Sequence, residues 1–205
     1  MRTRPIILAS LVLLALAAAG SSATGAERAR GGGCTISGTP GDDHLVGTDH
    51  RDVICARGGH DTVDGRGGND SLRGAGGDDD LNGGTGGDAL FGGDGADNLN
   101  GGLGSDSLIG GRGPDFVDAG PGRDFAEGDS GNDSIGLGAG PDFAFGNAGN
   151  DLIRGGAGND VCLSATDGVA HNDSVNGGPG NDISDSDEGD ELLNVEHDVQ
   201  ACFAE

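Results

Sequence analysis

The sequence predicts an all-β protein, a solenoid of stacked nine-residue turns with short parallel strands, and three observations support this prediction. Glycine supplies 46 of the 205 residues, aspartate recurs every nine residues, and an apolar residue follows each aspartate at a fixed distance. Aromatic residues make up only 3% of the chain, with no Trp and no Tyr, which disfavours a conventional core of large side chains. Composition alone would suggest a disordered acidic polymer, so the prediction depends on the order of the residues.

The aspartate repeat is unbroken over 14 successive units. Four extra residues then intrude around 164–170, and the register resumes at Asp173 and Asp182. The residues of the unbroken run are Asp43, Asp52, Asp61, Asp70, Asp79, Asp88, Asp97, Asp106, Asp115, Asp124, Asp133, Asp142, Asp151 and Asp160. Since chance cannot place one residue type so regularly, the period indicates a structural repeat.

Glycine and apolar residues flank this aspartate position. Glycine stands two residues before each Asp, except at His50 and His171, as expected for a tight turn that requires positive φ. Two residues after the Asp, a short strand would point one apolar side chain inward. Two units, or eighteen residues, would form one coil, and stacked coils would share a core that no single unit can bury. The predicted inward residues are Leu45, Ile54, Val63, Leu72, Leu81, Leu90, Leu99, Leu108, Val117, Ala126, Ile135, Ala144, Ile153, Cys162 and Val175.

The charge of the chain excludes several classes of partner and chemistry. The formal net charge is −24, from 35 acidic and 11 basic residues, and every basic residue is Arg. Such a surface repels nucleic-acid phosphates and anionic lipids. The absence of Lys also excludes a Walker phosphate loop and Schiff-base catalysis.

Residues 1–26 have the pattern of a secretory signal peptide. Arg2 and Arg4 precede an apolar run of 14 residues, 6–19, and small residues follow at 21–26. An uncleaved membrane anchor is the alternative, but the run is shorter than the ~18 residues that span a bilayer. We therefore expect a secreted, extracellular protein without a membrane span.

The nine-residue unit is seen in full in Gly83-Gly84-Thr85-Gly86-Gly87-Asp88-Ala89-Leu90-Phe91. Over about residues 38–185 the chain resembles the G-G-x-G-x-D-x-U-x nonapeptide repeat of RTX, or hemolysin-type, calcium-binding proteins. This resemblance implies a parallel β-roll with multiple Ca²⁺ ions between neighbouring turns. It implies that the Asp residues of the repeat, Asp173 and Asp182 included, are metal ligands together with carbonyl oxygens of the glycine loops. Calcium prefers six to eight such oxygen ligands.

Four cysteines, Cys34, Cys55, Cys162 and Cys202, form an even set that favours two disulfides in an exported protein. A zinc site is a weaker alternative because no C-x-x-C pair occurs. Of the three possible pairings we expect Cys34 with Cys55 and Cys162 with Cys202. In a roll, Cys34 and Cys55 would lie one coil apart, about 4.8 Å, whereas Cys34 and Cys162 would be separated by many coils.

The domain organisation follows from the extent of the repeat. We expect a signal peptide (1–26), an N-terminal cap (27–37), the repeat β-roll (38–185) with its insertion near 164–170, and a C-terminal cap (186–205). Neither flank is long enough to bury a core of its own. The N-terminal signal peptide and the cysteines depart from the resembled family, whose toxins usually leave the cell through a dedicated exporter.

These features predict a secreted calcium-binding repeat protein that folds on calcium, serves as a structural or cell-surface module and has no enzymatic activity. The alternative is a calcium-stabilised adhesin or another solenoid that binds a surface ligand through its flat face. The protein or glycan partner is not identified by the sequence. The segment Gly128-Asp129-Ser130-Gly131 resembles a serine-protease nucleophile, but it falls on repeat positions and no companion His is evident.

Overall fold

The computed structural model describes residues 33–161, 163–164, 173–185, 191–195 and 197–198. Apart from Gly33, these residues belong to one compact unit, Cys34–Glu205. Every regular element among them is a β-strand, and none of them forms a helix long and apolar enough to cross a membrane. The predicted all-β fold is confirmed.

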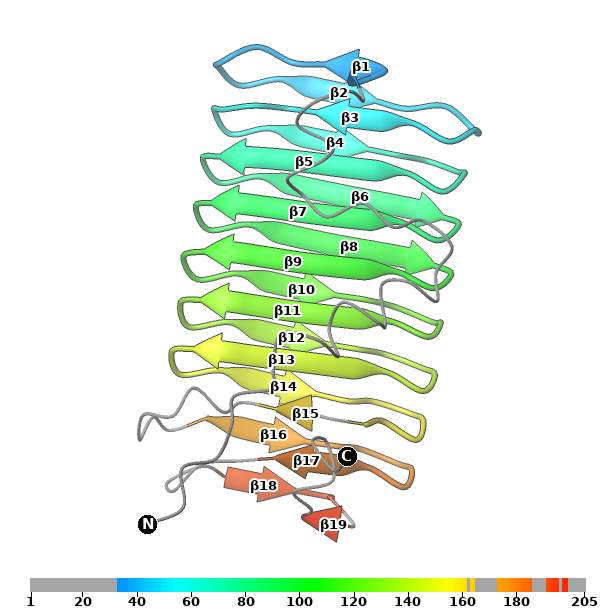
Figure 1. The fold of residues 1–205 in the computed structure, drawn as a ribbon, viewed down its shortest axis with the longest axis vertical. Coiled ribbons are helices and arrows are strands. Elements are labelled where there is room, and N and C mark those ends of the chain that lie inside the picture. Colours follow the sequence, from blue (N-terminus) through cyan, green and yellow to red (C-terminus); the bar gives the residue numbers. More distant parts are fainter. Residues whose placement is uncertain (1–32, 162, 165–172, 186–190, 196, 199–205) are drawn as a thin grey trace, which may run out of the picture. The chain divides into compact units, whose positions relative to one another are not determined.

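Successive strands alternate between two parallel sheets, which lie one behind the other in Figure 1. The ten-stranded sheet contains the odd-numbered strands: β1 (Ile36–Ser37), β3 (Val53–Cys55), β5 (Ser71–Gly76), β7 (Ala89–Asp94), β9 (Ser107–Arg112), β11 (Phe125–Ser130), β13 (Phe143–Ala148), β15 (Leu163–Ser164), β17 (Ile183–Asp185) and β19 (His197–Asp198). The nine-stranded sheet contains the even-numbered strands: β2 (His44–Val46), β4 (Thr62–Asp64), β6 (Asp80–Thr85), β8 (Asn98–Leu103), β10 (Phe116–Asp118), β12 (Ser134–Gly136), β14 (Leu152–Arg154), β16 (Ser174–Asn176) and β18 (Glu191–Leu193).

The pairing register confirms a coil of eighteen residues. Val53 pairs with Ser71, and Ser71 pairs with Ala89. In the other sheet Leu81 pairs with Leu99. Each coil therefore contains two nine-residue units, one strand in each sheet, as a parallel β-roll requires.

The core is the space between the two sheets. The middle residue of each short strand points into it, so the predicted inward residues from Ile54 to Ile153, and Val175, are 0–2% exposed. Three more residues of the core, Ala56, Ala119 and Leu137, come from the loops rather than the strands. Leu137 belongs to the same buried cluster as the small inward residues Ala126 and Ala144.

Glycine is needed two residues before the Asp because neighbouring loops stack closely. Gly86 has a φ of 138°, which is costly for residues with a Cβ. A Cβ added to Gly86 would also collide with the carbonyl oxygen of Gly68, one coil earlier. Loops such as that of Gly86 can therefore stack on the loop one coil earlier at strand spacing only if this position carries no side chain.

Near the C-terminus the structure corrects one predicted inward residue. The sequence register puts Cys162 in the core, but Leu163 pairs with Ala144 and is fully buried. The strand is shifted by one residue, which places a leucine in the core; Cys162 itself lies outside the described residues. Asp151 contacts Asp173 and Asp160 contacts Asp182 over 22 residues rather than 18, so four extra residues lie between Asp160 and Asp173. The predicted position of the insertion, 164–170, lies largely outside the described residues.

Both sheets extend into the segments predicted as caps. Ile36 pairs with Ile54 at the N-terminal end. At the other end Leu192 pairs with Val175, and His197 with Ile183. The flanking segments therefore lengthen the roll by continuing its ladders.

The predicted disulfide between Cys34 and Cys55 is present, with a Cα–Cα distance of 5.9 Å. It joins Cys34, two residues before β1, to Cys55 at the end of β3 in the next coil. The predicted pair Cys162–Cys202 lies outside the described residues.

We expect replacement of both Cys34 and Cys55 by Ser to destabilise the N-terminal end of the roll. The bond closes a loop of about 20 residues, for which the loss of chain entropy corresponds to ~3 kcal/mol. Denaturant unfolding of the double variant should show this decrease relative to the oxidised parent. Reduction of the disulfide in the parent should lower its unfolding free energy by the same amount, which would confirm that the bond is the cause. An unchanged denaturation midpoint in the double variant would contradict the prediction.

Candidate functional site

The loops between the sheets form two series, one at each edge of the roll. Loops at one edge lead into the even-numbered strands, and loops at the other edge lead into the odd-numbered strands. Each ends with one of the sixteen predicted Asp residues, so the structure places these residues in two columns. One column holds Asp43, Asp61, Asp79, Asp97, Asp115, Asp133, Asp151 and Asp173; the other holds Asp52, Asp70, Asp88, Asp106, Asp124, Asp142, Asp160 and Asp182.

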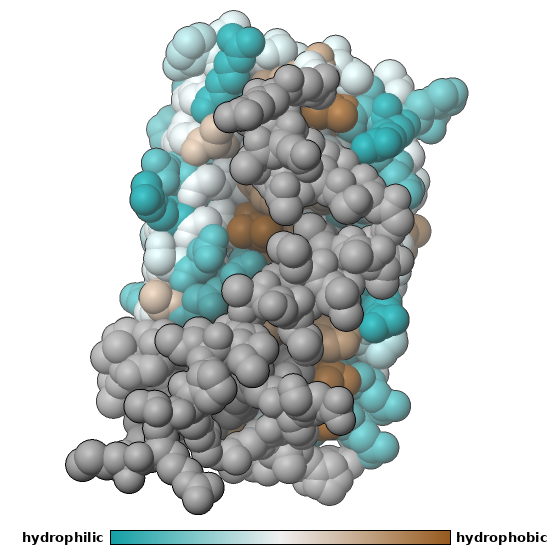
Figure 2. Space-filling view, viewed as in Figure 1, coloured by the Kyte–Doolittle hydropathy of each residue, from teal (hydrophilic) through white to brown (hydrophobic). Residues whose placement is uncertain are grey.

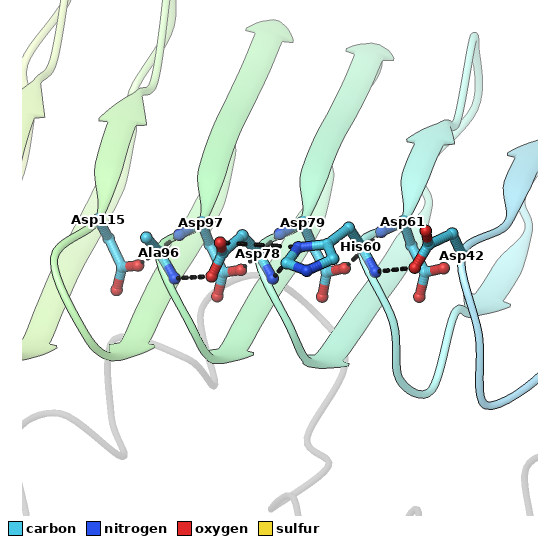
Figure 3. Close-up of polar contacts among 8 residues, drawn as sticks. All are labelled: Asp42, His60, Asp61, Asp78, Asp79, Ala96, Asp97 and Asp115. Atoms are coloured by element: carbon cyan, nitrogen blue, oxygen red, sulfur yellow. Dashed lines mark hydrogen bonds and ion pairs between the residues drawn. The ribbon is translucent and has the colours of Figure 1, made fainter.

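Within each column the aspartates are linked by hydrogen bonds. The backbone N–H of each Asp donates to Oδ1 of the Asp in the next coil, as Asp79 donates to Asp97 at 2.9 Å and Asp97 to Asp115 at 2.8 Å. All fourteen such bonds along the two columns measure between 2.6 and 3.1 Å. Figure 3 shows four of the carboxylates in one row. Oδ1 of each accepting carboxylate thus holds its own coil in register with the preceding one.

The second oxygen of most of these carboxylates is buried without a hydrogen-bond partner. The aspartates from Asp52 to Asp182 are at most 7% exposed. Oδ2 has no hydrogen-bond partner in Asp61, Asp70, Asp79, Asp88, Asp97, Asp106, Asp115, Asp124, Asp133, Asp142, Asp160 and Asp182. A buried carboxylate oxygen without a partner costs several kcal/mol. Its regular recurrence therefore indicates that the loops containing these residues are built for a positively charged ligand.

The residue five positions before each Asp, the first residue of the turn, marks where such a ligand fits. A Cβ added to Gly83 would lie 2.7 Å from Oδ2 of Asp88 and 2.6 Å from the carbonyl oxygen of Gly101 in the next coil. Gly65 has the same surroundings, with Oδ2 of Asp70 and the carbonyl oxygen of Gly83 both at 2.7 Å. Two oxygens thus border a space that glycine leaves open, and they are of the type that calcium prefers.

The described residues contain no cluster of three or more His, Cys, Asp or Glu side chains suited to a metal. Neighbouring coils supply two carboxylates per pair of loops. A calcium ion bound there would take its remaining ligands from loop carbonyl groups. The chain therefore fits calcium, an ion that accepts backbone carbonyl ligands, better than zinc, which is held by His and Cys side chains.

Burial makes these carboxylates hard to ionise when no cation is present. Burial raises the pKa of Asp70, Asp79 and Asp88 to about 6 and that of Asp115 and Asp124 to about 7, although the backbone hydrogen bond to each lowers it. The neighbouring carboxylate 18 residues away raises the pKa further, as Asp133 does for Asp115. Asp52 is the exception: its pKa is lowered, first by a hydrogen bond from the backbone of Thr48.

We expect the metal-free protein to gain structure on acidification. A folded-state pKa above the ordinary value of 3.8 means that the folded form binds more protons, so stability falls as pH rises from about 4 to about 7. Circular dichroism of the cation-free chain should therefore show more β-structure at pH 4.5 than at pH 7.5. A smaller β-signal at the lower pH would contradict the pKa directions given above.

A second ladder lies outside the aspartate columns, one residue before the Asp. The backbone N–H of His60 donates to Oδ1 of Asp42 at 2.9 Å, and that of Ala96 donates to Asp78 at 2.9 Å. The N–H of Asp78 donates to Nδ1 of His60 at 3.1 Å (Figure 3). At the opposite edge Gly87 donates to Asn69 at 3.0 Å. These exposed side chains serve the loop backbone, a role that the sequence analysis did not identify.

Two further features of the site were not predicted. The first residue of a loop is Gly in most units but Ala56, Ala119 or Leu137 in three, and those three side chains are fully buried. In the first two loops, Thr39 and Thr48 donate hydrogen bonds to the Oδ2 atoms of Asp43 and Asp52. Both features could have been found from the sequence by comparing the residues at each loop position.

Comparison with protein families gives one match, which covers most of the roll. The RTX calcium-binding nonapeptide repeat (4 copies) matches residues 35–63, 56–90, 73–108, 100–135, 137–165 and 167–190. Comparison with curated proteins gives no significant match. The matched segments coincide with the stacked loops whose aspartates have buried, unpartnered oxygens. The chain therefore belongs to the family of RTX calcium-binding nonapeptide repeat proteins.

Proposed function

We propose that this protein binds a series of calcium ions along the two edges of its roll and acts as a secreted structural or cell-surface module. The observation that carries the proposal is the buried Oδ2 atom without a hydrogen-bond partner, which recurs at one place in successive loops. Calcium between neighbouring loops would neutralise these carboxylates and satisfy the carbonyl oxygens beside them. The aspartates of the two columns are the proposed ligands.

Export is part of the proposal and has separate support. Residues 1–26 have the pattern of a signal peptide. The disulfide between Cys34 and Cys55 suits an oxidising compartment. Extracellular calcium, which is abundant, would then saturate even sites of modest affinity.

We further propose that the protein has no enzymatic activity of its own. The serine of the protease-like segment, Ser130, donates its hydroxyl hydrogen to the backbone carbonyl of Gly111, at 3.5 Å. The most strongly perturbed acids recur along the columns, which supports a binding array rather than a single catalytic centre.

Calorimetry and native mass spectrometry of the chain lacking residues 1–26 would test calcium binding. We expect several calcium ions per chain, bound cooperatively, and much weaker binding of magnesium, because magnesium demands octahedral geometry and dehydrates reluctantly. Binding should release protons near pH 6, since the cation displaces them from carboxylates of raised pKa. Saturation with one ion or none would refute the proposal.

Leu137 provides a test of where calcium sits within a loop. Leu137 stands where most units have the first glycine of the loop, in the loop that ends at Asp142, and its side chain is fully buried. We expect Leu137→Gly to add one calcium ion at saturation and to lower stability at limiting calcium, because truncating a buried leucine costs about 2–5 kcal/mol. Leu137→Ala is the matched control: it should destabilise the roll without adding an ion. An equal ion count in all three proteins would place calcium elsewhere.

A second candidate function, binding of a surface glycan, is favoured by one face of the roll. The outward side of the odd-numbered sheet carries half-buried apolar residues: Phe91, Ile109, Phe125, Phe143 and Phe145. Arg73 and Arg123 lie over the rings of Phe91 and Phe143, at 5.8 and 5.6 Å. The even-numbered sheet presents polar residues such as Asp80, Asn82, Asn98 and Asn100. It also carries the exposed Phe116, but without the row of neighbouring aromatic rings seen on the odd-numbered sheet. Figure 2 shows hydrophobic residues among hydrophilic ones on the face viewed.

Flat aromatic surfaces with hydrogen-bonding groups beside them suit neutral sugar rings, whereas the net charge of −24 disfavours anionic polymers. Co-sedimentation with insoluble neutral polysaccharides in calcium would test this candidate. Phe91→Ala with Phe145→Ala should abolish the retention, while Asn82→Ala with Asn100→Ala on the opposite sheet should not. Retention that is equal in both variants would exclude the aromatic face.

A further inference from the structure

The first two loops of the roll differ from later loops at their second residue. Thr39 and Thr48 occupy this position there. In the loops that follow, the same position has positive φ even where it is not glycine, as in Arg66 (72°) and Ala75 (88°). Neither threonine is among the residues with positive φ, a conformation that β-branched side chains strongly disfavour. The backbone of these two loops therefore takes a different path.

This backbone path places hydrogen-bond donors of the threonine beside Oδ2 of the loop aspartate, the oxygen that has no partner in most later loops. Oδ2 of Asp43 accepts hydrogen bonds from the backbone N–H of Thr39 at 2.5 Å and from its hydroxyl at 3.0 Å. Oδ2 of Asp52 accepts from the N–H and hydroxyl of Thr48 at 2.7 and 2.8 Å. Two donors stabilise each carboxylate in its charged form.

The contrast with the next coil is direct. Oδ2 of Asp61 and of Asp70 has no hydrogen-bond partner. Asp70 has a raised pKa because of burial, whereas Asp52 has a lowered pKa because of its hydrogen bonds from Thr48 and Thr35. In the first coil, hydrogen-bond donors of the protein itself thus stabilise the carboxylate charge. In later coils a cation would have this role. The disulfide between Cys34 and Cys55 spans the same part of the chain.

We propose that Thr39 and Thr48 close the first two loops in place of calcium, so that residues 34–55 form a metal-independent first coil on which the calcium-dependent coils stack. This inference rests on the proposed calcium function and specifies where the ion columns begin. The outermost ions would lie beyond Asp61 and Asp70. The first coil, covalently closed and internally hydrogen-bonded, would act as the template for the second.

The test is a gain of calcium sites in the whole secreted chain. Thr39→Gly combined with Thr48→Gly gives both loops the glycine found in later loops, and native mass spectrometry at saturating calcium should count up to two more ions than in the parent. Thr85→Gly is the matched control. Thr85, at the end of β6, stands one position later in its nine-residue unit and leaves Oδ2 of Asp88 without a partner, so its removal should not change the count. An unchanged count in the double variant, with calcium binding by the parent intact, would overturn this inference alone.

Hydrogen exchange of the calcium-loaded parent gives a second test that needs no variant. If the threonine N–H groups remain bonded to the carboxylates, the amides of Thr39 and Thr48 should exchange at least tenfold more slowly than unprotected amides. Fast exchange of both amides at saturating calcium would show that the ion has replaced them and would refute the inference. A parent that binds no calcium at all would instead refute the proposed function.

Discussion

Removal of calcium is expected to unfold most of the roll, with loss of the larger part of its β-signal in circular dichroism and a marked increase in radius of gyration. In the part of the chain that the structure describes, twelve buried carboxylate oxygens have no hydrogen-bond partner, and the chain carries a net charge of −24. Its 46 glycines also make the backbone entropy lost on folding high. Each ion that binds only the folded form adds about 2.7 kcal/mol at a hundredfold excess over its dissociation constant. Folding and binding should therefore be one event.

The measurement is a calcium titration of the chelator-treated chain, followed by circular dichroism and small-angle scattering. Magnesium at equal ionic strength is the control, because general charge screening would act equally with either ion. The first coil should keep its disulfide-closed loop, whereas the strand pairing of the later coils should be lost. If chelation at pH 7.5 left the β-signal and the compactness unchanged, coupled folding would be wrong.

Loss of an interior aspartate is expected to have a larger effect than loss of a terminal one. Asp97 accepts a hydrogen bond from Asp79 and donates one to Asp115, so it joins the coils before and after it. Asp97→Ala removes a carboxylate that belongs to two neighbouring pairs of stacked aspartates, one with Asp79 and one with Asp115. It also leaves the N–H of Asp79 without a partner, which costs about 1–3 kcal/mol for a buried group. Asp106→Ala should act in the same way at the other edge. Both should lower the number of bound calcium ions and the cooperativity of binding.

Asp43 and Asp182 are the matched terminal positions, because each has a column neighbour on one side only among the described residues. Asp43→Ala and Asp182→Ala should therefore have smaller effects, as in other stacked arrays whose units depend on their neighbours. Asp97→Asn separates the two roles, since the amide oxygen can still accept the hydrogen bond from Asp79 while the negative charge is lost. Equal losses of calcium at central and terminal positions would contradict a stacked array.

The period of the sequence predicted most of the fold because each residue type has a backbone reason to recur. Glycine permits the close stacking seen at Gly86 and Gly68, and one aliphatic residue per unit fills the core. The same period predicted that Cys34 and Cys55 would be one coil apart, and they are bonded. Repetition thus converts local preferences into a global arrangement.

Features that depend on individual residues were not predicted. The shift that places Leu163 in the core breaks the period, so a periodic argument could not find it. The different roles of Oδ1 and Oδ2 depend on side-chain orientation, which spacing does not specify. The role of Thr39 and Thr48 was not predicted, although threonine hydroxyl groups are suited to bonding with a nearby carboxylate. Calcium ligation by the sixteen aspartates stays a prediction.

The alternation of successive strands between two unlike sheets restricts how such a chain can change its length during evolution. Gain or loss of an even number of nine-residue units adds or removes whole coils, and every later strand stays in its own sheet. An odd number would transpose all later strands, moving Phe125 and Phe143 to the opposite face and exchanging the aspartates of the two edges. Extra residues within a single coil have no such effect, since the four near 164–170 leave the later strands in their proper sheets. Duplication should therefore add nine-residue units in even numbers, whereas a single loop can gain any number of residues.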